Sequence, residues 1–355
     1  MKIAYIVPSL IKSGPIKVVH QLVETLQSEH EIELFYFKSP DREQLHFNVP
    51  THKIAFRDEI DFDRFDIIHS HTIMADAYVW YHKNKIKKSK TVTTLHSYAK
   101  EELTFAYGKL KAFWMVKLWN LVTSKHDCVV TLSKDAVKYY KKIWHNKKLT
   151  YVYNGVSQIE TPKKASTLSL PANKNMIKIG TIASAGGISR RKGIDQIIRV
   201  LVHLKNYELY IAGKETDESL NLKKLADKLG VGNRVHFLGF CSKIEAFIEE
   251  MDLFVIAPRS EGFSLALQEI ASAKKAVVCS DIPIFKELMG EDEVCFFRLE
   301  DIESLKKSIE KAYANKEKYV KNAYLKYKKH YTPSQMARNY LTVYEKLQRE
   351  DNGKN

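Results

Sequence analysis

Short apolar runs alternate with segments of helical periodicity along almost the whole chain, and this alternation limits the fold more than any other feature of the sequence. Runs such as Cys128–Leu132, Leu253–Ala257 and Ala276–Cys279 are continuously apolar, as in strands covered on both faces. Helical segments, including a long one over Leu103–Thr123, supply the crossovers that parallel strands need. The pattern predicts an α/β protein with parallel sheets.

The alternation is interrupted once, near the middle of the chain. Residues 157–175 are polar, contain two prolines and lack periodicity, which is typical of a linker. A chain of 355 residues is long enough for two hydrophobic cores. We therefore expect two Rossmann-like parallel-sheet domains, residues 1–160 and 172–332, facing across a cleft. A last amphipathic helix is predicted over Pro333–Arg349.

The composition is that of an ordinary globular protein, with 45% hydrophobic residues. The four cysteines are scattered without a Cys-x-x-Cys pair, and three lie in or beside apolar runs, which indicates buried thiols in a reducing compartment. The first apolar run is interrupted by Pro8 and ends in no cleavage site, so it is not a signal peptide. No stretch approaches the length of a membrane span. The sequence predicts a soluble, cytoplasmic protein.

Positive charge is concentrated in residues 81–150, which contain sixteen lysines and four acidic residues within a chain of net charge +15. Aromatic residues are interleaved with these lysines: Phe105, Tyr107, Phe113, Trp114, Trp119, Tyr139, Tyr140 and Trp144. The pattern is compatible with three environments: an anionic membrane surface, a nucleic acid, or solvent with the aromatic side chains packed inward. We expect the membrane, at the inner face of the plasma membrane, and no nucleic-acid partner.

Two carboxylates, Glu261 and Glu269, bracket a Gly-Phe-Ser turn that opens a helix after a predicted strand. Backbone N–H groups at Phe263, Ser264 and Leu265 would face an anion that the helix dipole also favours. Glu269 would lie about 7 Å deeper along the helix axis. This spacing suits a nucleoside diphosphate whose ribose is held by Glu269, with Glu261 accepting hydroxyl protons beyond the phosphates. The alternative is a pair of surface glutamates beside a helix.

With its flanks DLFVIAPRS and AVVCSDIP, this segment resembles the Glu-x7-Glu signature of retaining GT-B glycosyltransferases, glycosyltransferase family 4 in particular. The resemblance spans nearly the whole chain and is strongest from Ile177 to Gly290. It implies a GT-B fold with an acceptor-binding N-terminal domain, on which residues 333–349 pack back, and a nucleotide-sugar-binding C-terminal domain. It also implies transfer of a sugar from a UDP-sugar, with a GDP-sugar as the alternative, with retention of configuration.

The resemblance assigns a basic pair to the donor diphosphate. Lys192 matches the lysine of the family and would stabilise the departing phosphate. The partner arginine of the family lies about five positions earlier, where this chain has glycines at 186 and 187, and its arginines are displaced toward the lysine. We expect Arg191 to take the role. A basic surface loop before a helix is the alternative.

Two further positions belong to the N-terminal half. Gly14, in the first turn between strand and helix, would let a backbone N–H approach a phosphate. His96 ends the predicted strand Thr91–His96, and the resemblance makes it the histidine that reaches the donor sugar and the reacting centre; a structural histidine is the alternative. His69 and His71 share one face of a strand, and we interpret them as structural or supporting residues.

The resemblance carries over two more donor-site residues. Asn154 lies in a loop near the domain hinge, where it would hydrogen-bond substrate or else cap a turn. Leu238 lies in the segment RVHFLGF, whose backbone would border the nucleobase. Asp61 and Asp63 form an Asp-x-Asp that we interpret as a solvated turn, so we expect no metal, and no cofactor besides the nucleotide sugar as co-substrate.

The predicted activity is that of a retaining, metal-independent hexosyltransferase. Its acceptor would be a glycan or a lipid-linked glycan in the synthesis of lipopolysaccharide, capsule or a related polysaccharide. A nucleotide-sugar epimerase or hydrolase of GT-B fold is one alternative, and its donor turnover would not depend on an acceptor. A non-catalytic basic protein that binds membrane or nucleic acid is the other, and it would tolerate loss of the Glu261 carboxylate.

Overall fold

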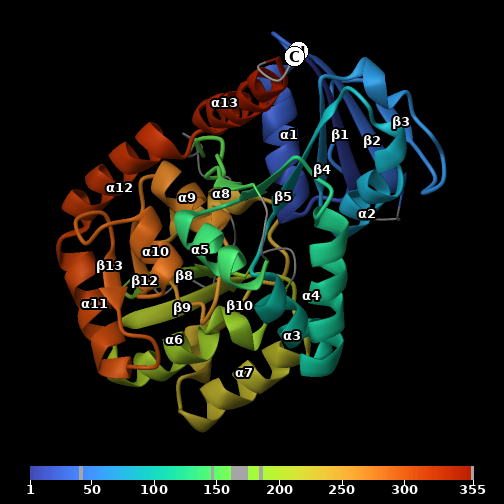
Figure 1. Ribbon diagram of the computed structural model, residues 1–355. Helices are drawn as coiled ribbons and strands as arrows, with labels where there is room; N and C mark the ends of the chain where they lie inside the picture. Colours follow the sequence, from blue (N-terminus) through green and yellow to red (C-terminus); the bar gives the residue numbers. More distant parts are fainter. Residues whose placement is uncertain (40–42, 145–147, 161–174, 184–186, 353–355) are drawn as a thin grey trace. The chain divides into compact units, whose positions relative to one another are not determined.

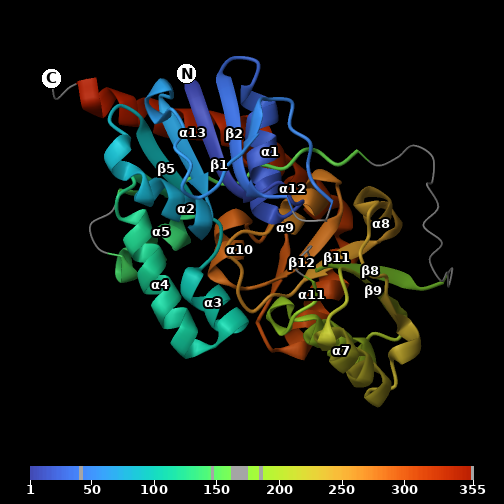
Figure 2. The same cartoon turned by 90° about the vertical axis from the view of Figure 1, so that its right-hand side faces the viewer.

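The computed structural model describes residues 1–39, 43–144, 148–160, 175–183 and 187–352. The chain forms two compact units, an N-terminal unit of Met1–Val156 with Tyr331–Asn355 and a C-terminal unit of Ser157–His330. Each unit contains one parallel sheet with helices packed against it (Figures 1 and 2). The expected linker falls mostly on residues 161–174, which lie outside the described ranges.

The N-terminal unit has a seven-stranded sheet in the order β3-β2-β1-β4-β5-β6-β7, and all pairs are parallel. Its strands are β1 (Lys2–Ser9), β2 (Glu31–Lys38), β3 (Thr51–Lys53), β4 (Ile67–His71), β5 (Lys90–Leu95), β6 (Cys128–Thr131) and β7 (Leu149–Tyr151). Its helices are α1 (Gly14–Leu26), α2 (Ile73–Tyr81), α3 (Ala99–Tyr107), α4 (Lys109–Thr123), α5 (Lys134–Ile143) and α13 (Pro333–Asn352). The strand order reverses between β1 and β4, and in open α/β sheets ligands bind outside the carboxyl ends of the strands at such a reversal.

The C-terminal unit has a six-stranded parallel sheet in the order β10-β9-β8-β11-β12-β13. Its strands are β8 (Ile177–Ile182), β9 (Tyr207–Ala212), β10 (Val235–Phe237), β11 (Leu253–Ile256), β12 (Ala276–Ser280) and β13 (Cys295–Phe297). Its helices are α6 (Ile194–Val200), α7 (Asp217–Lys228), α8 (Ile244–Glu250), α9 (Leu265–Ser272), α10 (Pro283–Leu288), α11 (Ile302–Ala314) and α12 (Lys316–His330). Here the order reverses between β8 and β11.

The central strands are buried on both faces, which is why their sequences are continuously apolar. The final helix packs back on the N-terminal unit, as expected, and lies beside α1 (Figure 1). Its Tyr340 and Tyr344 are fully buried, and Tyr344 lies 3.3 Å from the hydroxyl of Tyr5 on β1. The cysteines are free thiols, and three of them, Cys128, Cys279 and Cys295, are buried.

Several local expectations were wrong. The helix predicted over Leu103–Thr123 is two helices, because Gly108 between them has a φ of +79° that the helix interior does not allow. β5 ends at Leu95, so His96 follows the strand rather than ending it. The three-residue strands β3 and β13 were missed, and β3 is exposed along its whole length, so it has no apolar pattern. Within the described ranges, no helix is long and apolar enough to span a membrane.

Candidate functional site

The best-defined cluster of charged side chains in the C-terminal unit lies where its strand order reverses. The loops that follow β8 and β11 meet there, because these strands are neighbours in the sheet. Gly193 begins α6 with a φ of +65°, and a Cβ on it would lie 1.9 Å from the carbonyl oxygen of Ala257. Gln196 Nε2 also donates to that carbonyl at 3.2 Å. Only glycine allows the tip of α6 to approach the end of β11 so closely.

Arg259 fastens the two loops to each other. Its guanidinium donates to both carboxylate oxygens of Asp195 at 2.9 Å and to the carbonyl of Arg190 at 2.6 Å. Its backbone N–H donates to the carbonyl of Arg191 at 2.8 Å. The hydrogen bonds that Arg259 donates to Asp195 raise the pKa of Arg259, so this side chain is a permanent cation. Sequence reasoning missed the pair, because its members are 64 positions apart and belong to no local pattern.

Between these loops, Glu261 forms ion pairs with Lys192 and Arg191. Lys192 Nζ lies 2.7 Å from Glu261 Oε2, and Arg191 Nη1 lies 3.2 Å from Oε1. The Glu261 side chain is only 13% exposed and that of Lys192 only 16%. Burial by itself would raise the pKa of Glu261, but Lys192 and Arg191 outweigh it and the pKa is lowered. The structure thus brings together three residues that were selected from the sequence.

The charge balance of this cluster favours an anionic ligand. One carboxylate faces two cations, so the group keeps a net positive charge when Glu261 is ionised. Arg191 is also oriented by the carbonyl of Ser260, to which its Nη1 donates at 2.7 Å. A phosphate could therefore share both cations with Glu261.

Helix α9 begins directly after this loop, as predicted. Ser264 is its N-cap, and its Oγ accepts from the N–H of Leu267 at 3.2 Å. The cap satisfies one of the amides of the first turn and fixes the position of the others. Phe263 is buried beside the cap, Leu265 opens the helix, and Glu269 follows on it as a half-buried carboxylate.

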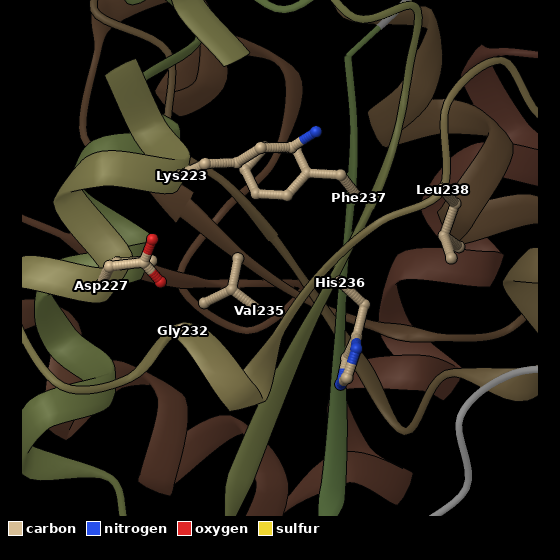
Figure 3. Close-up of a pocket in the computed structure, with 8 residues that line it drawn as sticks. Lys223, Asp227, Gly232, Val235, His236, Phe237 and Leu238 are labelled. Atoms are coloured by element: carbon tan, nitrogen blue, oxygen red, sulfur yellow. The ribbon is translucent and has the colours of Figure 1, made fainter. Parts of the chain in front are cut away.

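Leu238 directly follows β10, the edge strand of this sheet. It helps to line a cavity of about 460 Å³ between α7 and the edge strand β10. Figure 3 shows Lys223 and Asp227 of α7 at the left, Val235 between them and Leu238, and Leu238 at the right. This cavity shares no lining residue with the Glu261 cluster. Of the two glycines at the position of the family's arginine, the structure describes Gly187, and residue 186 lies outside the described ranges.

Two predicted residues of the N-terminal unit lie at loops that follow its strands. Gly14 opens α1 after β1 and is exposed. His96 follows β5, and its Nε2 lies 2.8 Å from Nδ1 of the buried His71 at the end of β4. Burial lowers the pKa of His96 to about 3, so both the ring and its partner are neutral at physiological pH.

Asn154 and Asp63 also belong to the N-terminal unit. Asn154 is buried, and its Oδ1 has no hydrogen-bond partner among the described residues. Asp63 accepts from the backbone N–H groups of Lys87 at 2.9 Å and Lys88 at 2.8 Å, so it organises a loop. Across the described ranges, no group of three or more His, Cys, Asp or Glu side chains could hold a metal ion.

The aromatic residues of the basic region divide between two environments. Trp119, Tyr140 and Trp144 point inward, and Trp119 Nε1 donates to the buried Asp76 carboxylate at 2.9 Å. Helices α3 and α4 expose a group of large apolar side chains: Phe105, Tyr107, Leu110, Phe113, Trp114, Leu118 and Leu121. On α4 these residues recur three or four positions apart, so they form one outward stripe, which we call the α4 stripe.

Residues 173–329 match the family described as Glycosyl transferases group 1, and residues 13–158 match Glycosyltransferase Family 4. The O-antigen biosynthesis glycosyltransferase WclY of Escherichia coli is 32% identical over 99% of each chain. Sucrose-phosphate synthase from Thermosynechococcus elongatus has a similar structure, with a TM-score of 0.80 at 16% identity over 98% of this chain and 99% of that one. Anabaena HepE, solved with UDP and glucose, has a TM-score of 0.78 at 16% identity over 98% of this chain and 100% of its own. Both structures share the GT-B fold of this chain.

Proposed function

The chain belongs to glycosyltransferase family 4, and from this premise we propose that it transfers a sugar, with retention, from a nucleotide sugar to a hydroxyl of a glycan or lipid-linked glycan. UDP-sugar is the favoured donor and GDP-sugar the alternative. HepE, which binds UDP and glucose, supports the donor class, and WclY, named for O-antigen biosynthesis, supports an acceptor in lipopolysaccharide or a related polysaccharide such as capsule.

The observation that carries this proposal is the Glu261–Lys192–Arg191 cluster at the reversal of strand order. In the reaction, the bond between the anomeric carbon and the diphosphate oxygen breaks while the acceptor oxygen bonds to the same face. The acceptor proton passes to the departing diphosphate. Lys192 and Arg191 stabilise the charge that develops on this leaving group, which is the costly part of the step. Because these cations supply the positive charge, we expect turnover without a divalent metal.

The other selected residues position the donor in this proposal. The helix tip at Phe263, Ser264 and Leu265 contacts the diphosphate, and Glu269 holds the ribose. Glu261 orients hydroxyls of the transferred sugar.

Four more residues act from loops of the two units. The loop at Gly14 and His96 contribute from the N-terminal unit, where acceptor binding is also proposed. Asn154 hydrogen-bonds substrate, and the backbone at Leu238 borders the base.

The proposal is tested by measuring diphosphate release from a panel of nucleotide sugars, with and without membrane extract and with and without a chelator. Glu261→Gln and Lys192→Met should each lower kcat by about 10²–10³-fold. Lys318 and Asp292 form an exposed ion pair at 2.8 Å in the same unit, so Lys318→Met and Asp292→Asn are matched controls that should retain activity.

The same assay separates the alternatives. Unchanged turnover in Glu261→Gln would refute the assigned site. Release that does not depend on an acceptor would instead indicate an epimerase or a hydrolase. Loss of release on adding the chelator would contradict the metal-independent mechanism.

We also propose that the α4 stripe lies on the anionic cytoplasmic face of the membrane, where a lipid-linked acceptor would be presented. Exposed aromatic side chains are flanked by lysines, and Lys117 Nζ lies 4.4 Å from the centre of the Phe113 ring. Apolar insertion combined with lysine charge is the combination that binds such surfaces.

Sedimentation with vesicles that contain anionic lipid tests this surface. Trp114→Ser with Leu118→Ser should reduce binding, and added salt should weaken binding of the wild type. Leu220→Ser, at an exposed position on α7, is the control for loss of an apolar side chain elsewhere. Equal binding by all variants would contradict the assignment.

A further inference from the structure

A pair of histidines, His71 and His96, lies at the carboxyl ends of β4 and β5 in the N-terminal unit. His71 is the last residue of β4 and pairs in register with Thr94, and His96 is the first residue after β5. β4 flanks the reversal of strand order in this sheet, which is the position where ligands bind in open α/β sheets. The pair therefore lies at the proposed substrate side of the unit.

The contact between the two rings contains a single proton. His71 Nδ1 lies 2.8 Å from His96 Nε2, and a neutral histidine carries a hydrogen on only one ring nitrogen. Either His71 donates from Nδ1, which leaves His96 protonated on Nδ1, or His96 donates from Nε2, which leaves His71 protonated on Nε2. The nitrogen that carries the proton decides whether His96 offers a donor or an acceptor to substrate.

The far nitrogen of His71 distinguishes these arrangements. His71 is fully buried, and its Nε2 has no hydrogen-bond partner among the described residues. A buried N–H without an acceptor is rarer in folded proteins than a buried acceptor without a donor. With the hydrogen on His71 Nδ1, only a lone pair is left at the buried Nε2, so this arrangement has a lower free energy than the one that buries an unpaired N–H.

A second layer holds the His71 ring in place. The ring centre of His69 lies 4.2 Å from that of His71. His69 is itself fixed from both sides, because its Nδ1 lies 2.7 Å from the hydroxyl of Tyr344 and its Nε2 lies 2.8 Å from Oγ1 of Thr94. With both nitrogens of His69 engaged, His69 cannot exchange a proton with His71.

We propose that His71 is a positioning residue that donates from Nδ1 to His96 Nε2, and so makes His96 a hydrogen-bond donor through its Nδ1 toward an oxygen of the nucleotide sugar. No hydrogen bond to Nδ1 of His96 occurs within the described part of the chain. The role in transfer rests on the proposed function, whereas the position of the proton does not.

Nitrogen NMR of the full chain labelled with ¹⁵N-histidine tests the position of the proton independently of activity. The signals of the pair are assigned from their loss in His71→Asn and His96→Gln. We expect a hydrogen on Nδ1 and a lone pair on Nε2 in both rings. A hydrogen on Nε2 of His96 would overturn the proposal, whatever the enzyme proves to catalyse.

Kinetics test whether His71 acts through His96. His71→Leu should lower kcat/KM by about tenfold, whereas His71→Asn, whose amide nitrogen can replace Nδ1 as a donor, should recover most of the loss. In a His96→Gln background, His71→Leu should have little further effect, because residues that act as a unit are non-additive. Full additivity of the two changes would refute the positioning role.

His69→Asn is the matched control, since it disturbs the same buried layer without touching His96. It should lower thermal stability but leave the hydrogens on Nδ1 of His71 and His96 in the NMR spectrum, because the hydrogen bond between these two rings remains. If His96→Gln itself leaves transfer unchanged, the catalytic role of His96 fails, while the NMR result still decides the tautomer.

Discussion

Replacing Gly193 by alanine tests whether the tip of α6 is held against the end of β11 by a contact that only glycine allows. Gly230, in the same unit, is the matched control. Both residues have left-handed φ angles, +65° for Gly193 and +69° for Gly230, but a Cβ on Gly230 would meet nothing within 4 Å. Alanine at either position has the same backbone strain, and only Gly193→Ala adds a steric clash.

The expected magnitudes follow from these distances. Left-handed alanine costs about 1–2 kcal/mol, and a stiffer unfolded chain recovers about 0.4–1 kcal/mol, so Gly230→Ala should cost about 1 kcal/mol. The Cβ of Gly193→Ala would lie 1.9 Å from the Ala257 carbonyl oxygen and 2.7 Å from Gln196 Nε2. Overpacking of this kind adds about 1–3 kcal/mol, and the lost Gln196 hydrogen bond adds about 1 kcal/mol. We expect a total of about 3–5 kcal/mol.

Hydrogen exchange at β8 and β11 is the appropriate assay, because it reports the opening free energy of the C-terminal unit. All four tryptophans lie in the N-terminal unit, so their fluorescence should show an unchanged transition in both variants. Because Lys192 precedes Gly193, a displacement of about 1 Å should also lower kcat/KM by about 10²-fold. Equal loss of protection in the two variants would refute the close-contact argument.

Three further outcomes are expected. The pKa of Glu261 is lowered in the folded state, so the ionised Glu261 stabilises the fold. This stabilisation is complete above the unfolded pKa of about 4.3 and is lost as the pH falls through the folded pKa. Hydrogen exchange measured during acid titration should show this loss of stability in the wild type and not in Glu261→Gln. Trp119→Phe should destabilise the N-terminal unit by about 1–3 kcal/mol in urea, since it removes a donor from the buried Asp76 carboxylate; no shift of the midpoint would contradict the importance of this bond. Asp127→Asn should lower the stability of the N-terminal unit by a similar amount, because Asp127 Oδ2 accepts hydrogen bonds from the backbone N–H of Thr91 at 2.7 Å and from its Oγ1 at 2.8 Å. A urea midpoint equal to that of the wild type would contradict this expectation.

The elements that the sequence predicts well are those whose residues are close together in the chain. Continuous apolar runs predicted the central strands, and Ser264 was correctly placed at the start of a helix that Glu261 precedes and Glu269 follows. The helix break at Gly108 was missed, because periodicity continues on both sides of it and the left-handed φ is visible only in the backbone.

The amino-acid sequence alone was sufficient to predict two parallel α/β units, because periodicity is a local property. The spacing of Glu261 and Glu269 selected Glu261, and the family resemblance of the segment after β8 selected Lys192. Only the tertiary structure decided which loops meet. The pairing of Arg259 with Asp195 and of His71 with His96 depends on the strand order that brings β8 beside β11 and β4 beside β5. That order is set by long-range packing of whole strands and helices, so no short stretch of sequence specifies it.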